Sequence, residues 1–240
     1  MEQMRTAAAI LIGNELLSGR TKDANLPYFG EKLNRYGIRL CEARVIADDE
    51  QTIVDTVNLM RKTYDYVFTT GGIGPTHDDI TSACVAKAFD VPLTRNAEAV
   101  ELLKAHYDEK GQELTSARLK MADVPEGSEL IYNIVSAAPG FIIGNVHVMA
   151  GVPSIMRAML DSLEDKLSGG PSMLSETIEL NAREGDIADK LTEIQGAYPD
   201  IEIGCYPKFQ DGVLSCSLVL RSLNEAAIAD CAQKIRQAFL

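Results

Sequence analysis

Short apolar runs and amphipathic segments alternate along the first ninety residues of the chain, and this alternation restricts the choice of fold more than any other feature. Strand-like runs lie at 6–12, 39–46 and 66–70. Each is followed by a segment with apolar residues at helical spacing, and these segments lie at 25–36, 50–62 and 79–89. Strands that are separated by helices pair in parallel through right-handed crossovers. The sequence therefore predicts an α/β fold, in which helices cover both faces of a mostly parallel sheet.

The middle of the chain continues with helices and then a hairpin. We expect two helices and three short strands, at 96–110, 115–121, 129–131, 141–143 and 146–149. Gly144 and Asn145 separate the last two strands and predict a hairpin turn. A long helix is expected to begin at Pro153 and to end at Leu167, because its apolar residues recur at helical spacing.

A glycine- and proline-containing linker at 168–172 divides the chain into two predicted domains. The first, at 1–168, holds the parallel sheet. The second, at 172–240, is expected to be a small α+β subdomain with the order βαββα. Its elements are predicted at 176–181, 184–195, 201–206, 213–220 and 224–239.

The composition excludes several classes of protein. A chain of 240 residues with 46% hydrophobic residues can bury a large core and is not disordered. The net charge of −12 argues against a surface that follows nucleic-acid phosphates. Five cysteines without a C-x-x-C pair indicate reduced thiols, and the apolar stretch 7–12 is too short for a signal peptide or a membrane span. We expect a cytoplasmic protein that binds neither nucleic acid nor membranes.

The segment TTGGIGPTHDDIT at 69–81 places glycines, a proline and two aspartates between the third strand and the following helix. Backbone N–H groups face outward at such a junction, and glycine lets the main chain approach a ligand, so the junction suits phosphate binding. Asp78 and Asp79 add carboxylates for metal ligation or acid–base chemistry. An ordinary tight turn with one aspartate as helix N-cap is the alternative. Phosphate chemistry accounts for more of the segment, because a cap uses only one aspartate.

Four polar or glycine-rich loops are expected to meet at one edge of the sheet, where the carboxyl ends of parallel strands form a crevice for ligands. These loops lie at 13–25, 48–49, 71–79 and 150–154. Asp48 and Asp49 have two interpretations: they cap the next helix, or they share a metal ion with the neighbouring aspartates. The small residues of 136–141 either admit a ring or only lead into the hairpin.

Five segments of the chain resemble the molybdenum-cofactor-biosynthesis-like (MoCF, MogA/MoaB-like) domain of the CinA (competence/damage-inducible protein A) family. They are IGNELLSGRTKDAN, VIADDEQTI, GGIGPTHDDIT, AAPGF and MAGVPSIM, in the family's order between Ile12 and Met156. The resemblance implies a three-layer α/β/α domain that binds a phosphorylated pterin or nucleotide. For the CinA branch it implies a pyrophosphatase for ADP-ribose-like or FAD-like dinucleotides that requires Mg, Mn or Co. It also implies a homo-oligomer, since relatives form dimers or trimers.

The resemblance further implies roles for individual residues. Asp79 and Asp49 would be the catalytic carboxylates, and Asp78 would join them as a metal ligand. The residues expected to bind the substrate or its phosphates are Gly13, Asn25, Gly71, Gly72, Gly74, Thr76, Gly140 and Gly151.

The chain departs from the family pattern in three ways. Ala150 replaces a common proline, and Ser136-Ala137 replaces a glycine-threonine pair, which affects the ring-binding side of the pocket. The sequence ends at Leu240, so we expect no C-terminal amidohydrolase domain and no NMN deamidation.

Three functions remain open at this point. A divalent-metal-dependent nucleotide pyrophosphatase is favoured by the clustered carboxylates. Molybdopterin binding in molybdenum cofactor biosynthesis would use the same pocket. A non-catalytic nucleotide-binding module is the third, and the sequence alone does not separate the three.

Overall fold

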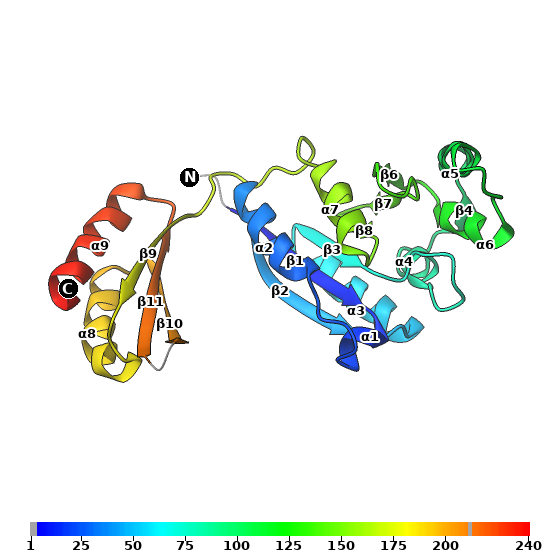
Figure 1. Cartoon of the computed structure of the whole chain (residues 1–240). Coiled ribbons are helices and arrows are strands. Elements are labelled where there is room, and N and C mark those ends of the chain that lie inside the picture. Colours follow the sequence, from blue (N-terminus) through cyan, green and yellow to red (C-terminus); the bar gives the residue numbers. More distant parts are fainter. Residues whose placement is uncertain (1–3, 211–212) are drawn as a thin grey trace. The chain divides into compact units, whose positions relative to one another are not determined.

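The computed structural model describes residues 4–210 and 213–240. The chain divides into two compact units, Met1–Gly170 and Pro171–Leu240, and each is described by itself (Figure 1). No helix in the described part of the chain has the length and apolar character needed to cross a membrane.

A six-stranded sheet forms the centre of the first unit. Its strand order is β2-β1-β3-β8-β7-β6, and the bounds are β1 (Arg5–Ile12), β2 (Ile38–Ile46), β3 (Tyr66–Thr70), β6 (Glu129–Ile131), β7 (Gly140–Ile143) and β8 (Val146–Met149). The first four strands of this order pair in parallel, whereas β7 and β6 are antiparallel to their neighbours. The predicted mostly parallel sheet and the hairpin between β7 and β8 are confirmed.

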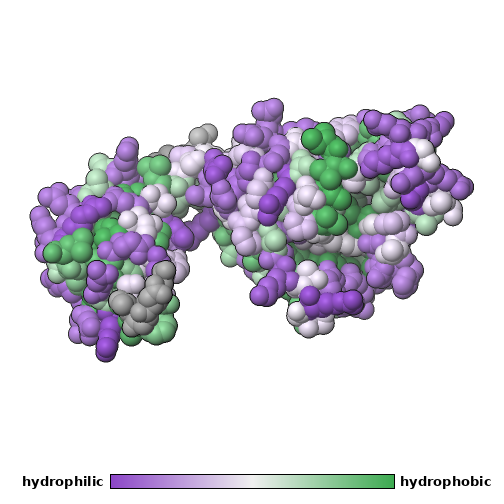
Figure 2. Space-filling view, viewed as in Figure 1, coloured by the Kyte–Doolittle hydropathy of each residue, from purple (hydrophilic) through white to green (hydrophobic). Residues whose placement is uncertain are grey.

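Helices cover both faces of this sheet, as Figure 1 shows. Successive side chains of a strand point to opposite faces, and β1 contributes alternate residues to two separate cores. Residues of α3 (Glu50–Thr63) and α4 (Thr81–Ala88) belong to one core, and residues of α2 (Asn25–Arg35) and α7 (Pro153–Asp161) belong to the other. The result is the predicted three-layer arrangement. On the visible face of this unit, hydrophilic side chains predominate and hydrophobic ones gather near α7 (Figure 2).

Smaller elements complete the first unit, and several boundaries differ from the predicted ones. The smaller elements are α1 (Asn14–Leu17), β4 (Leu93–Arg95), α5 (Ala97–Glu109), α6 (Ser116–Leu119), a 3-10 helix (Lys120–Ala122) and β5 (Asp123–Pro125). The antiparallel pair β4 and β5 and the single turn α1 were not expected. α7 ends at Asp161 rather than at Leu167, and the chain continues in turns that still bury Leu163.

The second unit has the predicted order βαββα. Its elements are β9 (Leu174–Leu180), α8 (Glu184–Ala197), β10 (Glu202–Gln210), β11 (Val213–Ser222) and α9 (Glu225–Phe239). The three strands pair antiparallel in the order β10-β11-β9. Apolar residues of both helices share one core with the sheet. This small antiparallel subdomain confirms the second part of the predicted fold.

A buried histidine in β8 makes the stability of the first unit depend on pH. His147 is 6% exposed, and its ring centroid lies 5.0 Å from that of Phe68 and 5.8 Å from that of Tyr66. Burial disfavours the charged imidazolium and lowers the pKa of His147 to about 4. The unfolded chain takes up this proton near pH 6.5, and the folded protein takes it up only near pH 4. Stability is therefore complete above pH 6.5 and is lost as the pH falls towards 4.

We expect this histidine to reduce the free energy of unfolding by about 2 kcal/mol between pH 7 and pH 5. Urea unfolding of the wild type and of His147→Phe at both pH values measures the effect. The variant lacks the titrating group, so its stability should change less with pH. The same pH dependence in both proteins would contradict the assignment.

Candidate functional site

A pocket opens at the carboxyl ends of β1, β3 and β8. Its volume of about 390 Å³ lies in the range of small-molecule sites, about 300–1,000 Å³. β2 lies on one side of β1 and β3 on the other, so the strand order reverses beside this pocket, where open α/β sheets place their ligands. Residues from the four loops expected at this edge line the pocket together.

Two glycines let the loop after β3 pass directly over the end of β1. Gly71 has a φ of +102°, and a Cβ atom there would lie 2.1 Å from the carbonyl oxygen of Ile12. Gly72 has a φ of +68°, and a Cβ atom there would lie 2.1 Å from the hydroxyl of Thr81. A residue with a side chain is unfavourable at both positions, because φ is positive and a Cβ atom would clash with a neighbouring atom. The glycines therefore hold the main chain at the wall of the pocket.

The two aspartates of the motif do not cap the helix that follows. α4 begins at Thr81, and its N-cap residue Ile80 makes no side-chain hydrogen bond. Instead, Oδ2 of Asp79 accepts a hydrogen bond of 2.7 Å from the Thr76 N–H. The Thr76 hydroxyl lies 2.5 Å from the same oxygen and 2.6 Å from Oδ1 of Asp78, and it has one proton to donate. The hydrogen bond from Thr76 lowers the pKa of Asp78, which keeps this carboxyl charged.

The second loop brings Asp48 to the pocket rather than Asp49. Asp48 accepts a hydrogen bond of 2.8 Å from the N–H of Asn14 and lines the pocket. Asp49 is the N-cap of α3, and its carboxylate accepts from the N–H and the hydroxyl of Thr52. These hydrogen bonds lower the pKa of Asp49. Asp49, which was expected to be catalytic and to bind the metal, thus caps the helix and is not among the residues that line the pocket, whereas its neighbour Asp48 is.

Two other residues expected to bind the ligand have supporting positions outside the pocket lining. Asn25 is buried, and its Nδ2 donates a hydrogen bond of 2.9 Å to the carbonyl oxygen of Gly151, which does line the pocket. Gly140 lies within β7, where a Cβ atom would be 2.3 Å from the carbonyl oxygen of Val148. Asn25 thus positions the last loop, and Gly140 permits close strand pairing. The remaining expected residues line the pocket: Gly13, Gly71, Gly72, Gly74, Thr76, Asp78, Asp79 and Gly151.

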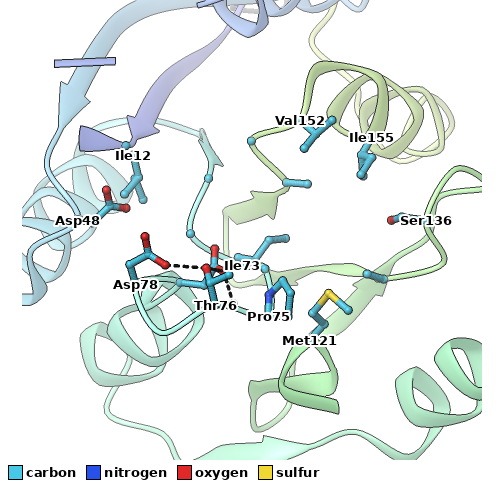
Figure 3. A pocket seen from close by; sticks show the side chains of 18 of the residues that line it. Ile12, Asp48, Ile73, Pro75, Thr76, Asp78, Met121, Ser136, Val152 and Ile155 are labelled. Atoms are coloured by element: carbon cyan, nitrogen blue, oxygen red, sulfur yellow. Dashed lines mark hydrogen bonds between the residues drawn. The ribbon is translucent and has the colours of Figure 1, made fainter. Parts of the chain in front are cut away.

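One side of the pocket is apolar, and only the loop at 150–154 of this side was expected from the sequence. Figure 3 shows Asp48 and Asp78 on one side and Met121, Val152 and Ile155 on the other. Tyr107 of α5 also lines the pocket, and the guanidinium of Arg118 lies 4.2 Å from its ring centroid. Tyr107 and Ile155 follow the apolar spacing of their helices α5 and α7, so in the sequence they resemble ordinary core positions. A planar ring is the kind of ligand group that such a wall accommodates.

The loop at 133–138 borders the apolar wall and is held by one buried asparagine. Oδ1 of Asn133 accepts hydrogen bonds from the N–H groups of Val135 and Ser136, and its Nδ2 donates to the carbonyl oxygen of Ala138. Ala137 has a φ of +56°, which is unusual for a residue with a side chain. Ser136 and Ala138 face the pocket. The departure from the family pattern at Ser136-Ala137 therefore lies at the pocket wall.

Carboxylates dominate the polar side of the pocket. Four acidic residues line it, namely Glu15, Asp48, Asp78 and Asp79, and among the described lining residues there is no lysine, arginine or histidine. Within residues 4–210 and 213–240, no three His, Cys, Asp or Glu side chains are grouped so as to hold a metal ion. Magnesium is often held by one or two carboxylates together with phosphate oxygens of the substrate. The residues present fit a metal ion that binds with a phosphorylated ligand.

Comparison with known proteins identifies both units. Residues 8–168 match the family described as "Probable molybdopterin binding domain", and residues 172–240 match "FAD synthase, middle domain". A protein of Archaeoglobus fulgidus is 39% identical over 83% of this chain and 84% of its own length. A probable FAD synthase of Caenorhabditis elegans is 30% identical over 99% of this chain, which spans 50% of that protein.

A solved structure agrees with these matches. The crystal structure of the protein CinA, of unknown function, from Thermoplasma acidophilum is 34% identical, with a TM-score of 0.63 over 68% of this chain and 98% of that one. The family match covers the sheet except for the first three residues of β1, and it covers every loop that lines the pocket. The chain belongs to the family of probable molybdopterin-binding (MoCF, MogA/MoaB-like) domain proteins and is CinA-like.

Proposed function

We propose that this protein hydrolyses the diphosphate bond of an FAD-like or ADP-ribose-like dinucleotide in the pocket, with the help of a divalent metal ion. The observation that carries the proposal is that the glycine turn at 71–74 and four carboxylates line one pocket that also has an apolar wall. The turn suits phosphate, the wall suits a ring, and the carboxylates suit a metal ion. The match of residues 172–240 to the middle domain of FAD synthase supports a flavin nucleotide as the ligand.

The reaction requires water and two oriented phosphates. A water oxygen attacks one phosphorus, the bond from that phosphorus to the bridging oxygen breaks, and two phosphate monoesters and a proton are released. Asp78 and Asp79 would hold the metal, with Asp48 on the same side of the pocket. A bound divalent ion would neutralise phosphate charge and lower the pKa of a bound water. The main chain at Gly71 and Gly72 would orient the phosphates.

Hydrolysis assays test this proposal directly. The wild type is incubated with FAD or ADP-ribose in the presence of Mg, Mn or Co, and the products are separated by chromatography. We expect FMN and AMP from FAD, AMP and ribose 5-phosphate from ADP-ribose, and no products when EDTA removes the metal. Absence of turnover in every combination of substrate and metal would reject the proposal.

Molybdopterin binding is the second candidate, and the match of residues 8–168 to the family of that description favours it. A ligand that binds only the folded protein raises its melting temperature. A pterin that raises the melting temperature more than FAD does, without dinucleotide hydrolysis, would favour this candidate. A rise with FAD but no turnover would favour a non-catalytic nucleotide-binding module.

A further inference from the structure

A single lysine from a distant segment reaches the turn that carries the carboxylates. Lys120 begins the short 3-10 helix Lys120–Ala122, and its Nζ donates a hydrogen bond of 2.5 Å to the carbonyl oxygen of Thr76. Thr76 lines the pocket, and Lys120 is partly buried. An ammonium group has three N–H donors. In the described part of the chain, this hydrogen bond uses one of them.

The position of Lys120 is significant because the charged side chains that line the pocket are all acidic. The four lining carboxylates repel a diphosphate, and none of the described residues that line the pocket is a cation. The ammonium of Lys120 lies close to the charges of the motif, because it donates to the main chain of Thr76, whose hydroxyl lies 2.6 Å from Oδ1 of Asp78. A lysine on a flexible stem binds phosphate as a mobile point charge.

Two side chains bind the main chain of Thr76, one at its N–H group and the other at its carbonyl oxygen. Asp79 accepts from the Thr76 N–H, and Lys120 donates to the Thr76 carbonyl oxygen. The turn between the glycines and α4 thus lies between an anion and a cation. A phosphate at this turn would offer Lys120 a charged acceptor in place of a neutral carbonyl, and charge-assisted hydrogen bonds are about twice as strong as neutral ones.

We propose that Lys120 is a phosphate-binding residue of this site, which contacts the diphosphate of the ligand from the rim of the pocket. The inference rests on the proposed function. It adds a positively charged side chain at the rim of a pocket whose described lining residues include none. In hydrolysis, the ammonium of Lys120 would stabilise the negative charge that grows on the departing phosphate as the bond to the bridging oxygen breaks. The proton released from water does not have to pass through Lys120.

Binding measurements separate this role from a structural one. The dissociation constants of ADP and adenosine are measured with Mg present for the wild type, Lys120→Met, Lys120→Arg and Lys104→Met. Lys104 is exposed on α5, outside the pocket lining, and serves as the matched control. We expect Lys120→Met to weaken ADP about 10- to 100-fold and adenosine less than about 2-fold. Lys120→Arg should keep most of the affinity, and Lys104→Met should match the wild type.

Melting temperatures of the four proteins show whether the turn remains folded. If Lys120 only held Thr76 in place, the methionine variant would weaken ADP and adenosine equally, and that result would overturn the proposal. Equal ADP affinity in Lys120→Met and the wild type would overturn it as well.

The experiment also distinguishes a failure of the proposed function. A wild type that prefers ADP to adenosine but turns over neither FAD nor ADP-ribose would reject hydrolysis, while the selective loss in Lys120→Met would still support phosphate binding by this residue. A wild type with no preference for ADP over adenosine would reject both proposals. Where hydrolysis is observed, kcat/KM should fall about 10- to 100-fold in Lys120→Met.

Discussion

Replacing Gly71 with alanine is expected to lower the free energy of unfolding by about 4 kcal/mol or more and to remove the phosphate site. The new Cβ atom would lie 2.1 Å from the carbonyl oxygen of Ile12, which is backbone of a central strand and cannot rotate away. The φ of +102° is also unfavourable for alanine. Relief requires the ends of β1 and β3 to separate.

Gly19 provides the control for this prediction. It has a φ of +72°, but a Cβ atom there would meet no atom within 4 Å. Gly19→Ala therefore carries the backbone penalty of a positive φ, about 1–2 kcal/mol, without a clash. Urea unfolding of both variants and titration of each with ADP measure the difference. Similar losses of stability in the two variants would show that the contact with Ile12 is not the cause.

The parts of the fold that could be predicted are those that repeat a pattern along the chain. Strands β1 and β3 carry apolar side chains on both faces because helices cover both sides of the sheet, so they were visible as continuous apolar segments. The edge strand β2 mixes apolar and charged residues and buries only its two end residues. Gly144 and Asn145 marked the hairpin, since the turn needs a residue with positive φ, and Gly144 has a φ of +56°. The start of α4 was predicted two residues too early, at residue 79 rather than at Thr81, because the side chain of Asp79 binds Thr76 in the turn before the helix.

The parts of the site that could not be predicted depend on tertiary contacts. Asp48 and Asp49 are adjacent and chemically identical, and only the direction of the chain entering α3 decides which one caps the helix. Tyr107 follows Leu103 by four residues, so it reads as another core position of α5. Lys120 is 44 residues from Thr76 in sequence, and no local pattern connects them. The motif predicted where the pocket lies, but not the whole set of side chains around it.

Asp79 is expected to have the largest effect on catalysis of any single side chain in the pocket. If the proposed hydrolysis occurs, Asp79→Ala should lower kcat/KM for FAD by about 100- to 1,000-fold, because it removes both a carboxylate for the metal ion and the hydrogen bonds that shape the turn. A 1,000-fold loss corresponds to about 4 kcal/mol of transition-state stabilisation. Asp108→Asn on the exposed side of α5 is the control, and it should keep wild-type activity.

The variant Asp79→Asn separates the effect of the negative charge of Asp79 from the effect of its hydrogen bonds to Thr76. An amide oxygen can still accept hydrogen bonds from Thr76, so this variant should keep the shape of the turn and most of the melting temperature, while it loses the negative charge. If the charge is what matters, both variants should lose hydrolysis to a similar extent, and only Asp79→Ala should lose stability, by about 1–2 kcal/mol. Wild-type turnover in Asp79→Asn would instead show that Asp79 acts by shaping the turn, and would leave Asp78 and Asp48 as the carboxylates for the metal ion.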